Sequence, residues 1–312
     1  MQLTGFHHLT AVTADIVSNH AFYTHTLGLR LVKKSVNQDD VSAYHLFYAD
    51  GIGSPGTDVT FFDWRMPREH RGTNSIVRTG LRVAKEVDLC WWEERLHAAG
   101  VVVAPIQQID GRLTLPFEDG EGQRLWLVTS DAAAPEHPWR ESDVPPEHQV
   151  LGLGPVSISV PVLEPTERVL TEVMAMRKVR EYPLAGAAVH VFSMGPGGPA
   201  AELHVAVEPG LTTARLGAGG VHHVAFRTTL AEYNDWDRRL HEFRMPSSGP
   251  VDRYYFKSLY FREPNGILFE IATDEPGFTA DEPLESLGKH LALPPFLESR
   301  RREIEIGLKP LR

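Results

Sequence analysis

Apolar residues recur along this chain in one order: an alternating, strand-like run, a run with helical spacing, and then further alternating runs. The order occurs four times, in units of roughly 50 to 65 residues, which indicates an internal repeat. The opening strand-like runs are 7–12, 75–83, 154–160 and 221–228. The helical runs are 15–28, 87–100, 165–176 and 230–243. The later strand-like runs are 43–50, 58–64, 113–117, 123–128, 188–194, 201–207, 258–263 and 267–273.

A stretch rich in proline and glutamate separates the second unit from the third. A chain of 312 residues is longer than one hydrophobic core usually supports. We therefore predict an N-terminal domain of two units at 1–133, a linker at 134–150 and a C-terminal domain of two units at 151–275. Residues 276–312 lie outside the repeat, and we expect a partly helical extension whose RRREIE run is a solvated helix face.

Composition and charge exclude several classes of protein. The chain is 42% hydrophobic and 23% charged, which is typical of a soluble globular protein. Its net charge of -10, with no long basic run, argues against a nucleic-acid partner. No apolar run is long enough for a membrane span, and the N-terminus lacks the features of a secretion signal, so we expect a cytoplasmic protein without a membrane partner. Cys90 is the single cysteine, so any metal must use nitrogen and oxygen ligands.

Two strand-like runs carry the same histidine doublet, His7-His8 in the first unit and His222-His223 in the fourth. Histidine is costly to bury without a partner, so the doublets call for a common explanation. Neighbouring side chains of a regular strand point to opposite faces. We therefore expect one histidine of each pair to face an interior site. Alignment of the apolar positions makes His8 equivalent to His223.

The last strand-like run of the fourth unit contains a carboxylate, Glu270, four residues after a glycine and among apolar residues. A buried carboxylate is unfavourable unless it is paired or binds a cation. The equivalent positions of the other units hold Thr60, Trp126 and Glu202. Only the fourth unit therefore combines the doublet with the carboxylate.

His8, His223 and Glu270 are the two imidazoles and one carboxylate of a facial triad that holds Fe(II) or Mn(II) and leaves coordination positions open. A structural zinc site would usually have four ligands, often thiolates that this chain lacks. The pattern therefore favours a catalytic metal site.

Structural interpretations compete with the metal site. Glu270 could instead form an ion pair with Arg253 or Arg262. We interpret Glu202 as structural because its unit has no histidine on its first strand, and His204 because it has no strand-borne carboxylate in an equivalent position.

The runs HHLTAVTADIVSNHAFYTHTLGLRLV, VHHVAFRT and DRYYFKSLYFREPNGILFEIAT resemble the vicinal oxygen chelate superfamily, which includes glyoxalases and extradiol dioxygenases. The resemblance covers the chain to about residue 275 and implies an α+β fold of four βαβββ modules in two cupped mixed sheets. The two doublets, the DRxYFxSxYFR pattern and LFEIATDEPGF are most similar to hydroquinone 1,2-dioxygenases.

By position, the resemblance implies that His8, His223 and Glu270 bind Fe(II), with Mn(II) as the alternative metal. It implies that His7, His222, Arg253 and Tyr260 support the metal or line the substrate pocket. The implied activity is ring cleavage of a hydroquinone-type diol with insertion of both atoms of O2. Because the ligands come from the first and fourth units, we expect these two units to form one cup. Alternatives are an extradiol catechol dioxygenase, a glyoxalase-type isomerase or lyase, and a non-catalytic binding module; a homo-oligomer is left open.

Overall fold

The computed structural model describes residues 1–130 and 136–311, so 131–133 of the predicted first domain and 134–135 of the predicted linker lie outside it. The first unit contains β1 (Phe6–Thr13), α1 (Ile16–Ala21), β2 (Arg30–Val36), β3 (Tyr44–Ala49) and β4 (Asp58–Asp63). The second contains β5 (Ser75–Val83), α2 (Glu86–Ala98), β6 (Val102–Val103), β7 (Gln107–Ile109), β8 (Arg112–Glu118) and β9 (Arg124–Thr129). The third contains β10 (Gly152–Val160), α3 (Leu163–Arg168), β11 (Arg177–Leu184), β12 (Ala187–Ser193) and β13 (Glu202–Val207). The fourth contains β14 (Val221–Thr228), α4 (Tyr233–Glu242), β15 (Val251–Asp252), β16 (Lys257–Arg262) and β17 (Leu268–Thr273).

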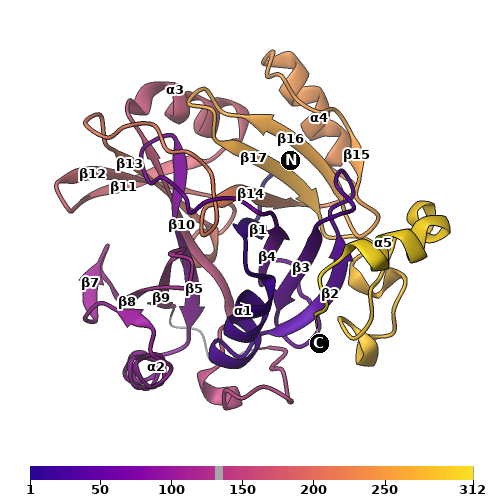
Figure 1. Cartoon of the computed structure of the whole chain (residues 1–312). Coiled ribbons are helices and arrows are strands. Elements are labelled where there is room, and N and C mark those ends of the chain that lie inside the picture. The colour runs from indigo at the N-terminus through magenta and orange to yellow at the C-terminus, as the bar shows by residue number, and fades with distance from the viewer. Residues whose placement is uncertain (131–135, 312) are drawn as a thin grey trace.

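Two mixed sheets combine these units in pairs (Figure 1). One sheet has the order β15-β16-β17-β14-β1-β4-β3-β2 and so joins the fourth unit to the first. The other runs β11-β12-β13-β10-β5-β9-β8-β6 and joins the third unit to the second, with β7 paired to β8. The predicted α+β fold and the predicted meeting of the first and fourth units are confirmed. Each sheet takes strands from both sides of 134–150, and the division of the chain into two domains stays a prediction.

The first helical run ends in a wide turn. α1 passes into a π-helical turn at Phe22–Thr26, in which the Leu27 amide donates to the Phe22 carbonyl. Gly28 then turns the chain with φ of 69°, a backbone conformation that other residues rarely adopt. A Cβ atom at this position would lie 2.5 Å from side-chain atoms of Ser142 and Val144. The predicted end of the helix at Gly28 thus has both a conformational and a steric cause.

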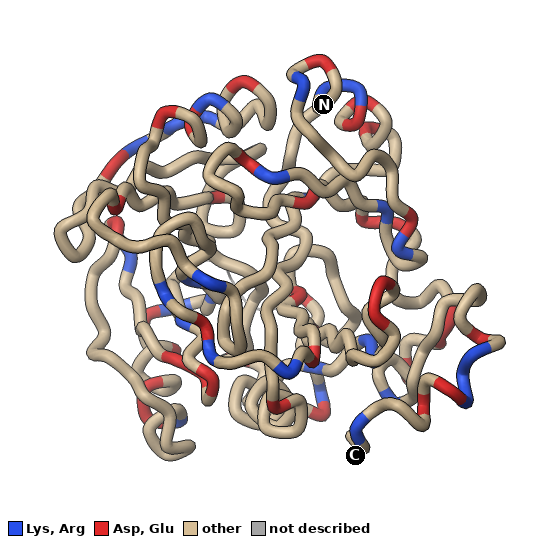
Figure 2. The backbone as a smooth tube through the Cα atoms, turned by 45° about the horizontal axis from the view of Figure 1, so that its top comes forward, with Lys and Arg blue, Asp and Glu red and all other residues tan. Residues whose placement is uncertain are grey.

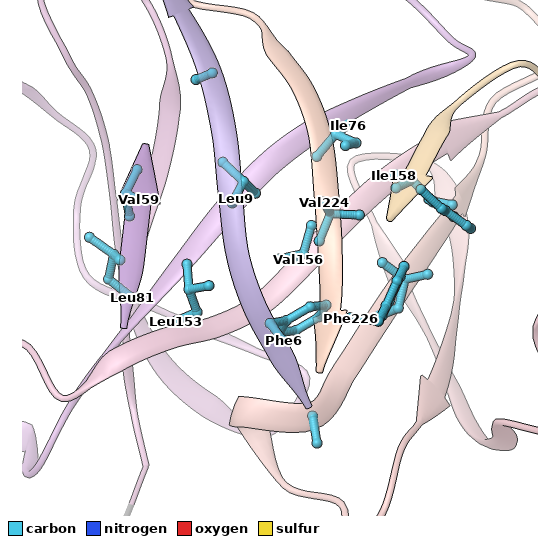
Figure 3. Close-up of a cluster of buried hydrophobic side chains, with 14 of the residues drawn as sticks. Phe6, Leu9, Val59, Ile76, Leu81, Leu153, Val156, Ile158, Val224 and Phe226 are labelled. Atoms are coloured by element: carbon cyan, nitrogen blue, oxygen red, sulfur yellow. The ribbon is translucent and has the colours of Figure 1, made fainter. Parts of the chain in front are cut away.

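The core lies where the two sheets pack face to face. Figure 3 shows apolar side chains from strands of both sheets meeting in this layer. The labelled members are Phe6, Leu9, Val59, Ile76, Leu81, Leu153, Val156, Ile158, Val224 and Phe226. Each is buried, and burial of one such side chain stabilises the fold by about 1.5 to 3 kcal/mol. This layer occupies one face of β1 and β14, which leaves the opposite face of both strands for the cup.

The pattern of apolar residues did not predict β2, because two lysines interrupt its alternation. Lys33 is nevertheless fully buried. Its ammonium group donates to the Phe278 carbonyl at 3.0 Å and to Asp281 at 2.8 Å, and it also pairs with Glu282. It lies 4.5 Å from the ring centroid of Tyr255. The C-terminal extension therefore supplies the partners that make a lysine acceptable inside this sheet.

The C-terminal extension lies beside β2 (Figure 1). The Ala292 amide donates to the Lys34 carbonyl at 2.8 Å, so the extension covers the edge of the sheet. Its helix α5 (Arg301–Gly307) confirms the expected helical part. Blue and red segments alternate along this extension in Figure 2. Exposed pairs such as Arg301 with Glu298 confirm that the arginine-rich run is a solvated helix face.

Within residues 1–130 and 136–311, no helix is both long enough and apolar enough to cross a membrane.

Candidate active site

Three neighbouring strands bring the predicted ligands together. His8 lies on β1, His223 on β14 and Glu270 on β17, and β14 pairs with both of the other strands. In the antiparallel β1–β14 pair, Thr10 is opposite His223, and in the parallel β14–β17 pair Ala225 is beside Glu270. All three predicted ligands therefore project from the same face of the sheet into the cup.

The ligand atoms converge on one point. The Nε2 atoms of His8 and His223 lie 3.3 Å apart. Oε2 of Glu270 lies 3.3 Å from Nε2 of His8 and 3.0 Å from Nε2 of His223. All three side chains are almost fully buried. The arrangement is the compact N, N, O set that a divalent cation requires.

The carboxylate of Glu270 supports this interpretation. Oε1 accepts a hydrogen bond from the Ser258 hydroxyl, whereas Oε2 has no hydrogen-bond partner among the described residues. Burial by itself would raise the pKa of Glu270, but His8 and His223 hold this pKa well below its usual value. An ionised, buried oxygen that faces two imidazole nitrogens without bonding them fits a site for a bound cation.

The second histidine of each doublet contacts the first. Nδ1 of His7 lies 2.9 Å from Nδ1 of His8, and Nδ1 of His222 lies 2.8 Å from Nδ1 of His223. Burial, followed by the neighbouring histidine, lowers the pKa of both His7 and His222 to about 3, so both rings are neutral. An imidazole that binds metal through Nε2 carries its proton on Nδ1. Each predicted ligand can therefore donate to its neighbour, a contact that orients the ring.

The strict alternation expected for the doublets is not observed. The β1–β14 register shifts between Phe6 and His8 and again between Thr10 and Ala11. Such a shift, as in a β-bulge, re-aims a side chain that would otherwise point to the opposite face. It allows adjacent histidines to hydrogen-bond each other, which regular alternation would prevent.

Arg253 and Tyr260 form a hydrogen-bonded pair at the edge of the site. Nε of Arg253 donates to the Tyr260 hydroxyl oxygen at 3.2 Å, and Nη2 donates to Asp39 at 2.8 Å. The ring of Tyr260 lies 5.8 Å from that of His223. Burial, and then the charge of Glu270, raises the pKa of Tyr260 well above its usual value, so its hydroxyl keeps a proton to donate.

Neither arginine considered as a partner for Glu270 pairs with it. Arg253 bonds Asp39 and Tyr260, and Arg262 donates to the Gly266 carbonyl at 2.7 Å. Glu270 thus faces the imidazoles and Ser258.

A pocket of about 40 Å³ opens beside His8 and His223. Aromatic and apolar side chains form much of its wall, as is usual for small-molecule sites. The lining residues that shape this wall are Val36, Phe47, Phe62, Tyr255 and Phe256.

Sequence reasoning missed several polar residues of the pocket, among them His45 on β3. Its Nε2 lies 2.9 Å from Oγ1 of Thr60, which in turn lies 2.7 Å from Oγ1 of Thr10. The alternation of β3 contained a usable signal, because His45 and Phe47 share a face of the strand. A single histidine within an apolar run is, however, a weak signal.

The other sheet contains a second acidic cluster, where Glu202 bonds two arginines. Arg180 donates to its two oxygens at 2.9 and 2.7 Å, and Arg112 donates to it at 2.8 Å. Both arginines also bond Asp110. The geometry agrees with a structural role for Glu202. Nε2 of His204 lies 3.6 Å from Oε2 of Glu202, which is two residues earlier on the same strand.

Comparisons with known proteins found relatives over the whole chain. A Bacillus subtilis protein named ring-cleaving dioxygenase MhqA is 47% identical over 316 residues, covering 100% of both chains. The chlorohydroquinone/hydroquinone 1,2-dioxygenase of Sphingobium indicum is 30% identical, covering 97% of this chain and 95% of that protein. A scan against models of protein families found no match.

Comparison with solved structures identifies proteins with a similar fold. The crystal structure of a dioxygenase from Bacillus subtilis is 32% identical with a TM-score of 0.92, covering 100% of this chain and 98% of that one. Glyoxalase I from Zea mays, at 15% identity and a TM-score of 0.66, covers 92% of this chain and 97% of its own and shares the fold.

Proposed function

The chain belongs to the family of ring-cleaving dioxygenases, and on that premise we propose that it cleaves hydroquinone-type aromatic diols with a metal held by His8, His223 and Glu270. The proposed metal is Fe(II), with Mn(II) as the alternative. The observation that carries the proposal is the unbonded, buried Oε2 of Glu270, which faces the imidazole nitrogens of His8 and His223 beside the aromatic pocket that these two histidines line. The named activity of the Sphingobium indicum relative supports hydroquinone as the substrate class.

When bound, the metal would supply the redox chemistry that lets dioxygen react with a diol, and both oxygen atoms would enter the product. The protein's own contribution is to bind and orient the ring. Tyr260 can donate its hydroxyl proton in a hydrogen bond to oxygen near His223, because Arg253 already occupies a lone pair of that hydroxyl. Arg253 adds a positive charge that favours an anionic oxygen in the pocket.

The doublets contribute rigidity. His7 and His222 hold the rings of His8 and His223 through their Nδ1 atoms, as outer hydrogen-bond partners commonly do for metal-bound imidazoles. A diol whose two oxygens lie at opposite ends of the ring can place only one of them at the metal. Orientation of such a substrate therefore depends on the pocket more than it does for a catechol, which can chelate through two oxygens.

The alternatives are less well supported. A glyoxalase-type isomerase would need a second carboxylate near the metal, and the equivalent position holds Thr60, which bonds Thr10 and His45. A non-catalytic binding module would have no need for paired histidines that orient a triad. A cytoplasmic location and a homo-oligomer remain predictions.

The test is anaerobic purification with metal analysis, followed by oxygen-consumption assays on hydroquinones and catechols. We expect Fe(II) or Mn(II) near one equivalent and oxygen uptake with a hydroquinone. Efficient cleavage of catechols alone would make the protein an extradiol enzyme. No uptake with either diol by the metal-loaded protein would leave an isomerase or a binding role.

A further inference from the structure

Several polar side chains that line the pocket beside His8 and His223 already form hydrogen bonds within the protein. The Ser35 hydroxyl donates to the Ala292 carbonyl, and the Gln38 amide donates to the Arg253 carbonyl. The Tyr255 hydroxyl donates to Asp281. These groups are therefore engaged before any substrate arrives.

His45 differs from the other imidazoles of the pocket. Its Nε2 bonds Thr60, but its Nδ1 has no hydrogen-bond partner in the described part of the chain. In His8 and His223, by contrast, Nδ1 bonds the neighbouring histidine. His45 is partly exposed and lines the pocket. A molecule bound in the pocket can therefore contact the His45 side chain, whose Nδ1 is unpaired.

The ring of His45 is held in place from two sides. Its centroid lies 4.0 Å from the ring of Phe47 and 4.4 Å from the ring of Phe62. The contact with Thr60, itself bonded to Thr10, prevents rotation of the imidazole about its Cβ–Cγ bond. A ring fixed in this way presents Nδ1 in one direction, as a specific recognition group requires.

The position of His45 suits the end of a substrate that points away from the triad. The ring centroid of Phe62 lies 4.4 Å from that of His45 and 6.4 Å from that of His223, so the Phe62 ring is a neighbour of both imidazoles. Tyr260 stands on the other side of His223, on β16. A ring bound through one oxygen at the metal is thus flanked by Tyr260 from the fourth unit and His45 from the first.

We propose that Nδ1 of His45 hydrogen-bonds the second oxygen of the aromatic diol, the one not at the metal, and thereby selects para-diols over monophenols. The inference rests on the proposed function and adds the residue that recognises the far hydroxyl. Burial, and then His8 and His223, hold the pKa of His45 well below its usual value, so the ring is neutral and its nitrogen can donate or accept according to tautomer.

The test compares the binding of hydroquinone and phenol to the metal-loaded protein without oxygen, by isothermal titration calorimetry. The natural protein should bind hydroquinone about tenfold more tightly than phenol, the ratio expected for one additional hydrogen bond. His45→Phe, which keeps an aromatic ring between Phe47 and Phe62, should bring this ratio close to one and leave phenol affinity nearly unchanged.

Two amide variants sharpen the test, because they separate the two ring nitrogens. The amide of asparagine overlays Nδ1 of histidine, whereas that of glutamine overlays Nε2. His45→Asn should therefore retain more of the preference for hydroquinone than His45→Gln, which keeps only the group that faces Thr60. This comparison also serves if His45→Phe does not fold.

Asn37 provides the control, since it lines the same pocket and its carbonyl oxygen already accepts from the Asp39 amide. Asn37→Ala should keep the preference for hydroquinone. The inference is overturned if the His45 variants keep the natural ratio, or if Asn37→Ala alone abolishes it. Failure of the proposed function would be detected in the oxygen-consumption assay and not in the binding ratio, because the natural protein would take up no oxygen with any hydroquinone.

Discussion

Ser258 donates a hydrogen bond to Oε1 of Glu270 and thereby decides which carboxylate oxygen faces the imidazoles. The two residues lie on neighbouring strands, β16 and β17, and both are fully buried. With Oε1 occupied, Oε2 is directed toward His8 and His223. A serine that sequence reasoning did not single out thus orients the only carboxylate of the triad.

Ser258→Ala should lower metal affinity by about 10- to 100-fold, because the carboxylate loses the bond that orients it. Competition with a chelator measures the affinity directly. Ser159→Ala is the matched control: Ser159 is a buried serine of the other sheet whose hydroxyl has no hydrogen-bond partner among the described residues. Equal metal affinity in Ser258→Ala and Ser159→Ala would contradict the orienting role.

Replacement within a doublet separates ligand from supporting residue. His8→Ala or His223→Ala should abolish tight metal binding, as should Glu270→Ala, because each removes one of three ligands. His7→Ala and His222→Ala should still load when metal is in excess but lose oxygen consumption, since the ligand ring is no longer held. Metal analysis after gel filtration checks both. If His7→Ala lost metal while His8→Ala kept it, the ligand assignment would be reversed.

Tyr260→Phe should lower hydroquinone turnover by roughly 10- to 1000-fold, the range expected for loss of one preorganised donor, and leave metal content unchanged. A catechol, which can chelate the metal, should lose less. Steady-state oxygen uptake with both diols, together with metal analysis, measures this difference. Equal losses with the two diols would show that Tyr260 does not act by orienting a singly bound substrate.

Glu202 should contribute to stability and not to metal binding. Glu202→Gln should lower the free energy of unfolding by about 1 to 3 kcal/mol, since Arg112 and Arg180 lose one of their two carboxylate partners and keep only Asp110. Urea unfolding measures the loss, with metal content as the control. A fall in bound metal in this variant would instead indicate a second metal site.

Glu202 should also make the free energy of unfolding depend on pH. Burial favours the neutral form of Glu202, but the nearby imidazole of His204 and the hydrogen bonds from Arg180 and Arg112 outweigh it and lower its pKa well below 4.5. At pH values between the folded and unfolded pKa, the unfolded state binds more protons, so stability rises with pH. The contribution is therefore present above about pH 4.5 and is lost as the pH falls below it. Urea unfolding at a series of acidic pH values should show a shallower fall for Glu202→Gln than for the natural protein.

Local patterns in the sequence were enough to predict the repeated units, the two doublets and the strand-borne carboxylate. These features are local: alternation and helical spacing are visible within a few residues, and a glutamate in an apolar strand stands out because its burial is costly. The equivalence of His8 and His223 followed from the repeat, although their ring nitrogens meet across 215 residues of chain. The family resemblance rested on the same short motifs.

The pairing of polar groups became visible only in the folded protein. The contact between His7 and His8 depends on a register shift of β1 against β14, and strand register is a property of two strands together. Lys33 could be recognised as buried only with the extension in place, and Glu202 as structural only with Arg112 and Arg180 beside it. The proposed role of His45 could be inferred only once the structure placed it beside Thr60 and in the wall of the pocket. In each case the partner lies on another strand or loop, and the cost of burying a polar group is offset by a contact that no single segment contains.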